Sequence, residues 1–274
     1  MLNKLLEFSS GIVKLSSLHL LRTLSLLPLN CRYIFLDLLS SIVFVFCVKK
    51  RIAVTKNLQL IFGRNPTSKE VRKVFIEYGR YWAEFFDIKK LWIKKEKILE
   101  NSDFPPKQRG FLGLTFHIGN FEMFGPALYQ SLGENFYVVA EKLSPDYLSD
   151  FFMSNRLRHN ITTILHDNKR QILSLLNQGQ SLGIVCDRVV GGKGIETRFF
   201  GKKVRLPLNI VSFALQKKIP IYVSYCVKEK GFLRIYHERL KTDLCFDEAV
   251  QHITKILEDA VKRYPFQWHV LSAI

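Results

Sequence analysis

The stretch FLGLTFHIGNFEMFGPAL, residues 111–128, joins a short apolar run to a polar turn and then to a second apolar segment. Its first part predicts a buried strand over Phe111–Phe116, and its second part predicts a helix over Phe121–Ser131. The Gly119-Asn120 pair between them is typical of a turn, with Asn120 as the helix N-cap. The sequence therefore places a polar turn where a strand passes into a helix.

The same alternation continues to the C-terminus and predicts an α/β fold, with a largely parallel sheet flanked by helices. The expected strands are Phe111–Phe116, Phe136–Ala140, Ser181–Cys186, Pro220–Val227 and Phe232–His237. The expected helices are Ser68–Asp87, with Thr67 or Ser68 as N-cap, Phe121–Ser131, Pro145–His159, Asn168–Gln178, Leu206–Lys217 and Asp247–Tyr264.

The composition excludes a disordered chain and indicates an anionic partner. The 274 residues are 47% hydrophobic, include 22 Phe and carry a formal net charge of +17. An apolar chain with this charge is suited to an anionic membrane surface, a nucleic acid or an acidic protein. The five Cys are widely spaced without a C-x-x-C pair, so neither a disulfide framework nor a zinc site is expected, and a cytoplasm-facing location follows.

Residues Tyr33–Val48 form an apolar run whose one charged residue is Asp37. Its 16 residues fall short of the roughly 20 that a spanning helix needs, so an interfacial or tilted membrane helix and a buried core helix both stay open. Lys49–Lys97 carries a net +9, from 14 basic and 5 acidic residues. This flank is expected on the cytoplasmic side, unless it is simply a solvated helix face.

His117 and Glu122 form an H-x-x-x-x-E motif across the turn. Within one regular helix, the two side chains would point roughly 140° apart. Across a strand-to-helix turn, with His117 on the loop, the Glu122 carboxylate can fold back onto one imidazole N–H. The other nitrogen is then left as a general base. A structural His is the alternative, but no P-loop, G-x-S-x-G motif or metal-spaced His/Cys cluster competes with this motif.

Several ordered motifs give the chain a family resemblance. HIGNFE (117–122), RLRHN (156–160), VCDRVVGGKGIETRFFGKKVRLP (185–207) and FQWHV (266–270) together resemble the bacterial lipid A biosynthesis acyltransferase family, a branch of the membrane-bound glycerolipid acyltransferases. The similarity runs in order over most of the chain.

The resemblance implies an acyltransferase (EC 2.3.1) that moves a fatty acyl chain from an acyl carrier protein or CoA thioester to a glycolipid hydroxyl. His117 would be the general base and Glu122 its orienting partner, and neither a metal nor another cofactor is expected. Residues 1–50 would be a membrane-associated helical segment and residues 51–274 the acyltransferase domain. The enzyme would work at the cytoplasmic face of the inner membrane, with no nucleic-acid partner.

The acceptor stays open between lipid A and another glycolipid. The family's second acidic residue after Asp187 is replaced by Val189, and its Thr-rich stretch by Arg205-Leu206-Pro207. The C-D-R motif (186–188) with a later L-P motif (206–207) is closer to the phosphatidylinositol mannoside acyltransferase subgroup. The alternative from another class of function is a non-enzymatic basic protein, which would bind membrane or nucleic acid through Lys49–Lys97.

Five further residues are candidates for substrate binding. Arg156 and Arg158 match an R-x-R motif of the family and suit a phosphate, with Arg158 preferred over a merely helix-terminal role. Asp187 ends an expected strand and suits a sugar hydroxyl, unless it only forms a turn. Asn120 and Arg188 are also expected to bind the substrate.

Overall fold

The computed structural model describes residues 24, 26–85, 110–126, 133, 135–189, 194–241, 243–272 and 274. The strands are β1 (Leu112–Gly119), β2 (Phe136–Ala140), β3 (Ile161–Leu165), β4 (Ser181–Val185), β5 (Ile195–Phe199), β6 (Lys202–Leu206), β7 (Ile221–Glu229) and β8 (Phe232–Arg239). The helices are α2 (Leu29–Phe46), α3 (Val48–Phe62), α4 (Ser68–Phe85), α7 (Asp146–Leu157), α8 (Lys169–Asn177), α9 (Asn209–Gln216) and α10 (Phe246–Arg263), with short 3-10 helices η2 (Phe121–Met123) and η3 (Pro265–Gln267).

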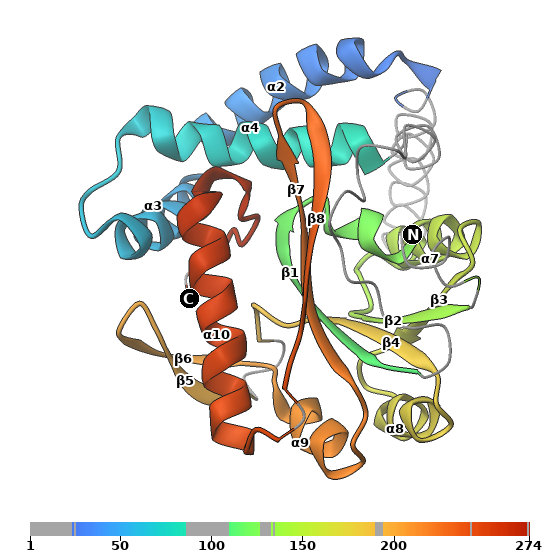
Figure 1. Ribbon diagram of the computed structural model, residues 1–274. Coiled ribbons are helices and arrows are strands. Elements are labelled where there is room, and N and C mark those ends of the chain that lie inside the picture. Colours follow the sequence, from blue (N-terminus) through green and yellow to red (C-terminus); the bar gives the residue numbers. More distant parts are fainter. Residues whose placement is uncertain are drawn as a thin grey trace, which may run out of the picture.

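A six-stranded sheet in the order β3-β2-β4-β1-β7-β8 forms the centre of the fold (Figure 1). Each neighbouring pair is parallel except β7 and β8, which are antiparallel. The antiparallel pair β5-β6 lies apart from this sheet and contacts α10. The expected α/β fold with a largely parallel sheet and flanking helices is confirmed.

Helices cover both faces of the sheet, and β1 alternates its side chains between them. Leu114, Phe116 and Ile118 pack into a core shared with α8, α9 and α10. Phe111 belongs to the core on the opposite face, beneath α7 and the end of α4. This alternation turns His117 toward the α4 side of the sheet.

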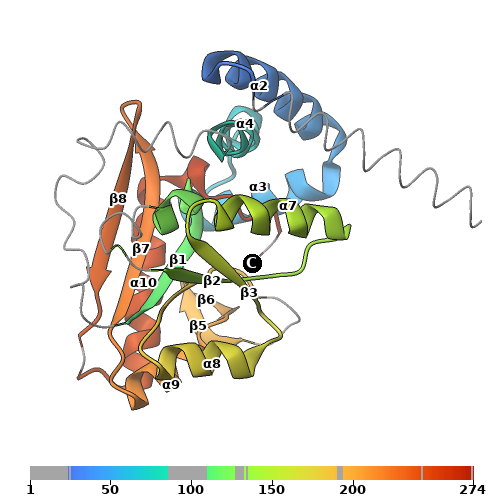
Figure 2. The same ribbon diagram turned by 90° about the vertical axis from the view of Figure 1, so that its right-hand side faces the viewer.

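The N-terminal helices α2, α3 and α4 lie at one end of the sheet (Figure 2). There they form a third, smaller hydrophobic core. α4 begins with a reciprocal capping box, in which Thr67 N donates to Glu70 Oε2 (2.7 Å) and Glu70 N donates to Thr67 Oγ1 (3.3 Å). α4 then carries Val71, Val74 and Phe75 into the core with α3. α2 packs along α4 but is mostly exposed, so of the two readings left open for Tyr33–Val48 the buried core helix is wrong.

The sequence reading missed three strands and misplaced two boundaries. β3, β5 and β6 were not expected, because β5 and β6 form a mostly exposed hairpin with several charged side chains and β3 is a short run that includes two Thr. Leu206 ends β6 and does not start a helix. β1 continues through Gly119, so His117 lies within the strand and not on a loop. The expected helix over Phe121–Ser131 is confirmed as far as the structure describes it: it begins as the 3-10 turn η2, residues 124–126 are α-helical, and residues 127–131 lie outside the described part of the chain.

Candidate active site

The carboxyl ends of β1 and β4 bring His117 and Asp187 together. These strands are parallel neighbours, with Thr115 opposite Val185, so two positions further along His117 faces Asp187. His117 Nδ1 lies 2.7 Å from Asp187 Oδ1, and the His117 backbone N donates to Asp187 Oδ2 at 2.9 Å. The Asp187 side chain is fully buried, whereas that of His117 is 26% exposed. Asp187 therefore fixes the Nδ1 side of the imidazole ring, and the exposed part of the ring is accessible to a substrate.

The C-terminal segment completes the support of this pair. Trp268 Nε1 donates to Asp187 Oδ2 at 2.9 Å, and Trp268 forms an antiparallel bridge with Ile118. The next residue, His269, donates its backbone N to the His117 carbonyl at 2.7 Å. The FQWHV motif thus holds both the carboxylate and the backbone of the histidine.

Electrostatics keep Asp187 ionised. Burial alone would raise the pKa of this carboxyl, but the charge of His117 and the hydrogen bonds from His117 and Trp268 outweigh burial and lower it below 3.8. An ionised carboxylate can only accept hydrogen bonds, so Nδ1 of His117 must carry the proton. Nε2 is then the basic nitrogen, as a general base requires.

Glu122 is not the partner of His117, and the expected His117–Glu122 contact is wrong. The Glu122 carboxylate instead forms a bidentate pair with Arg156 of α7, at 3.0 Å to Nε and 2.5 Å to Nη2. Both side chains are largely buried, 9% and 16% exposed. The reason is local: β1 extends to Gly119 and Glu122 lies in the 3-10 turn η2 that follows, so its carboxylate meets the end of α7. The nearest aromatic neighbour of His117 in this turn is Phe121, whose ring lies edge-on at 5.0 Å between centroids.

Gly119 fixes the backbone between His117 and Asn120. Its φ of +58° is in the left-handed region, and a Cβ there would lie 2.1 Å from the carbonyl oxygen of Cys226. The next amide, Asn120 N, donates to that same carbonyl at 2.8 Å. Glycine is therefore required for β1 to stay against β7 beyond the histidine.

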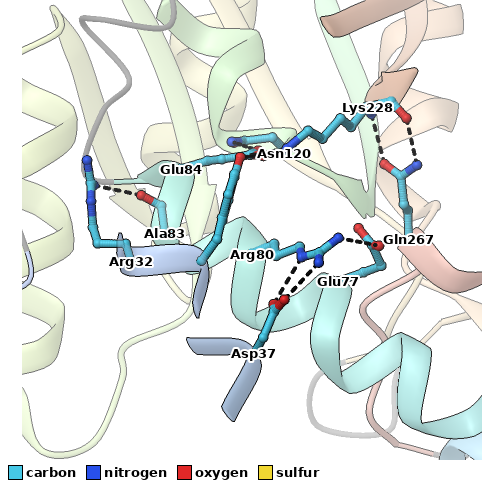
Figure 3. Close-up of polar contacts among 10 residues, drawn as sticks. Arg32, Asp37, Glu77, Arg80, Ala83, Glu84, Asn120, Lys228 and Gln267 are labelled. Carbon is cyan, nitrogen blue, oxygen red and sulfur yellow. Dashed lines mark hydrogen bonds and ion pairs between the residues drawn. The ribbon is translucent and has the colours of Figure 1, made fainter. Parts of the chain in front are cut away.

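Asn120 is buried and serves a network rather than a substrate pocket or a helix cap. Its side chain makes no capping hydrogen bond with η2, and its Nδ2 donates to Glu84 Oε2 at 3.0 Å. The other oxygen of Glu84 accepts from Lys228 Nζ at 2.9 Å and from Tyr33 Oη at 2.7 Å (Figure 3). This network connects the turn Gly119-Asn120 after His117, here called the catalytic turn, to α4, to β7 and to α2.

The remaining candidates lie in different environments. Asp187 has no exposed surface, so the expected contact with a sugar hydroxyl is wrong. Arg156 is bound to Glu122, whereas Arg158 is exposed at the C-cap of α7. Arg188 is 42% exposed and pairs with Glu141 at 2.5 Å. Arg158 and Arg188 therefore stay predictions for substrate binding.

Sequence reasoning missed the roles of three residues. Trp268 and His269 lie in the FQWHV motif and Glu84 lies in the expected helix Ser68–Asp87, but the sequence assigned none of them a contact with the site. His269 is buried, with its ring beside those of Tyr78 and Tyr81 at 5.4 and 5.5 Å between centroids. No sequence signal marks Glu84, because helical spacing places it on the side of α4 that carries Glu77 and Arg80 and not in the apolar stripe.

A strand-end histidine that is held through Nδ1 by a buried carboxylate, with Nε2 as the basic nitrogen, has the arrangement of a general base for a hydroxyl. The whole sequence matches one family, described as bacterial lipid A biosynthesis acyltransferase, over residues 5–273. The chain belongs to this family and is an acyltransferase, which confirms the resemblance seen in the motifs.

Two curated relatives agree with this assignment. The chain is 26% identical over 239 residues to a phosphatidylinositol mannoside acyltransferase of Mycobacterium tuberculosis strain CDC 1551 / Oshkosh, covering 79% of this chain and 74% of the relative. It is 27% identical to the protein of the same description from strain ATCC 25618 / H37Rv, over the same length and coverage.

Proposed function

We propose that this acyltransferase moves a fatty acyl chain from an acyl carrier protein or CoA thioester to a hydroxyl of a glycolipid. The single observation that supports the chemistry most directly is the His117–Asp187 pair, with Nε2 of His117 as the base. The family description and the names of the two relatives support a glycolipid acceptor.

In the proposed reaction, Nε2 of His117 removes the proton of the acceptor hydroxyl as its oxygen attacks the thioester carbonyl. The ionised Asp187 stabilises the imidazolium that forms, and the buried Trp268 keeps the carboxylate in place. Collapse of the tetrahedral intermediate breaks the C–S bond, and the imidazolium returns the proton to the leaving thiolate. The products are the acylated glycolipid and a free thiol.

The acceptor is proposed as either a lipid A precursor or a phosphatidylinositol mannoside-like glycolipid. The family description favours the first, and the relatives and the C-D-R and L-P motifs favour the second. Arg158 and Arg188 are proposed to bind the acceptor's phosphate or the donor, because both are exposed guanidinium groups. Acyl carrier protein and CoA are both acidic, so the net charge of +17 suits either donor.

The site of action is proposed to be the cytoplasmic face of the inner membrane. α2 is long and apolar enough to associate with a membrane, and the basic residues Lys49, Lys50 and Lys56 follow it directly. The division into a membrane-associated segment, residues 1–50, and a catalytic domain, residues 51–274, is part of the same proposal.

The test is acyl transfer by the purified full chain in mixed micelles. Acyl carrier protein and CoA thioesters are each offered with a lipid A precursor and with a phosphatidylinositol mannoside, and products are identified by mass. We expect transfer to one acceptor class and its loss in His117→Ala. Transfer that persists in His117→Ala, or a folded protein that acylates neither acceptor, would refute the proposal. A non-enzymatic basic protein would instead show no turnover and a steep salt dependence of nucleic-acid binding.

A further inference from the structure

α2 presents polar groups to the protein and an apolar surface to the outside: its inner face carries polar side chains beside the apolar Leu36, Val43 and Phe44, and its outer face is apolar. Two of its three buried side chains are Arg32 and Ser40. Arg32 Nη1 donates to the carbonyl of Ala83 at 2.7 Å, with no exposed surface left on its side chain. Gly79 of α4 faces Ser40 so closely that a Cβ would lie 2.2 Å from the Ser40 hydroxyl.

Polar contacts join α2 to α4 from Arg32 to Ser41, and the paired positions run in opposite directions along the two helices. Figure 3 shows the contacts of Arg32 with Ala83 and of Asp37 with Arg80. Tyr33 Oη donates to Glu84, and Arg80 forms a bidentate pair with Asp37 at 2.7 and 3.0 Å. One turn further, Arg72 donates to the Ser41 hydroxyl at 2.8 Å. Each contact joins a polar or charged group of α4 to the inner face of α2.

The outer face of α2 is a continuous apolar stripe. Ile34 and Phe46, near its two ends, are 73% and 77% exposed. The exposed apolar side chains of α2 are Ile34, Phe35, Leu38, Leu39, Ile42, Val45 and Phe46. Val48 and Ile52 at the start of α3 are exposed apolar side chains as well, and Lys49, Lys50 and Lys56 of the same helix are exposed. An apolar face with a basic border is typical of a helix that binds an anionic lipid surface.

The contacts with α4 argue against a spanning orientation of α2. An 18-residue helix is about 27 Å long, so its length alone would fit the hydrocarbon layer of about 30 Å. If α2 crossed the bilayer, however, α4 would have to enter with it or all polar contacts between the helices would break. Entry would place Arg72, Glu77 and Arg80 in hydrocarbon, and separation would break the contacts of Arg32 with Ala83 and of Asp37 with Arg80 there.

We propose that α2 lies in the plane of an anionic bilayer surface, with its apolar stripe in the acyl chains and its polar face on α4. This proposal rests on the membrane association given under the proposed function. In this orientation α2 does not cross the membrane, and the Tyr33–Glu84–Asn120 connection stays intact while the stripe is embedded.

Depth measurements on the full chain test the orientation. Nitroxide labels are placed singly by Ile34→Cys, Leu38→Cys, Ile42→Cys and Phe46→Cys, in a chain whose accessible Cys31, Cys47 and Cys245 are Ser. On phosphatidylglycerol–phosphatidylcholine vesicles we expect all four labels at one shallow depth in the acyl region. A depth that increases to the middle of α2 and decreases beyond it would show a spanning helix and overturn the proposal. Four labels in water on the same vesicles would overturn it as well.

A matched pair of charge substitutions tests the stripe without labels. Leu38→Arg should lower partition onto these vesicles at least tenfold, whereas Leu173→Arg, at an exposed leucine of α8, should change it less than twofold. Equal partition of Leu38→Arg and the wild type would refute the role of the stripe. Neither experiment needs turnover, so a failure of the orientation is distinguishable from a failure of the acyl-transfer chemistry, which His117→Ala reports.

Discussion

Asp187 and His117 are 70 positions apart in the chain, yet Oδ1 of the first lies 2.7 Å from Nδ1 of the second. The contact exists because β4 and β1 are parallel neighbours and both residues stand at the carboxyl ends of their strands. The ends of parallel strands are where α/β sheets present functional groups. The orienting carboxylate is thus supplied by the next strand of the sheet and not by the next turn of the chain.

Asp187→Asn should therefore cost more activity than Glu122→Gln. Asparagine can fill the same volume but cannot stabilise an imidazolium, and its amide can orient the wrong nitrogen of His117. We expect kcat to fall by about 10²–10⁴ with the fold retained. Acyl transfer at saturating substrate, with circular dichroism as the control for folding, measures the effect. Wild-type turnover in Asp187→Asn would contradict the assignment of the pair.

The sequence located the parts of this site but not their pairing. The apolar run before His117 predicted β1, and Asp187 was recognised as the end of a buried strand, because both features depend on local pattern. The order of the sheet depends on which strands pack together, and no local pattern placed β4 beside β1. Glu122 was chosen as partner because it was close in sequence, and the extension of β1 through Gly119 removed that contact.

The distribution of polar and apolar side chains around α2 could not be predicted either, because it also depends on packing between elements. The apolar run Tyr33–Val48 contains Asp37, which a one-dimensional reading treats as a defect in a hydrophobic segment. In the structure Asp37 pairs with Arg80 of α4 and lies on the inner face of α2. The partner of a charged side chain in another helix is a property of packing, so it became visible only in three dimensions.

Glu122 and Arg156 should behave as a structural pair in a double-mutant cycle. Removal of one member leaves a largely buried charge without its partner, so Glu122→Gln and Arg156→Met should each lower the free energy of unfolding by about 3 kcal/mol or more. The double variant should be more stable than the sum of the two losses predicts. Urea unfolding of the four proteins measures this coupling. Additive losses would show that the pair contributes nothing as a unit.

His269 should make the protein sensitive to acid. Burial, with a smaller effect of the nearby His117, lowers the pKa of His269 from 6.5 to about 3. Between these pH values the unfolded chain binds a proton at this position and the folded chain does not, so stability falls as the pH decreases from 6.5 toward 3. The contribution of this one group approaches about 1.4 kcal/mol per pH unit within the window.

His269→Phe isolates that contribution. Phenylalanine keeps an aromatic ring beside Tyr78 and Tyr81 and cannot titrate. The slope of the unfolding free energy against pH between 6 and 4 should be smaller in the variant than in the wild type, with little change above pH 7. Parallel curves would mean that His269 is protonated in the folded state, contrary to its buried position.

The Glu84–Asn120 hydrogen bond should position the catalytic turn. Asn120→Asp places a second carboxylate 3 residues after His117 and against Glu84, where two buried like charges repel each other. We expect kcat to fall about tenfold or more, because displacement of this turn moves the base relative to the thioester. Lower thermal stability should accompany the loss.

The exchange Glu84→Gln with Asn120→Asp tests whether the contact itself matters. The glutamine amide can donate to the new aspartate, and Lys228, which already contacts residue 84, keeps an opposite charge nearby. The double variant should therefore regain part of the kcat lost in Asn120→Asp, while Glu84→Gln alone should not exceed the wild type. If the double variant is no more active than Asn120→Asp, the network stabilises the fold without positioning His117. Steady-state kcat and KM for the three variants, measured against His117→Ala as the inactive reference, separate these outcomes.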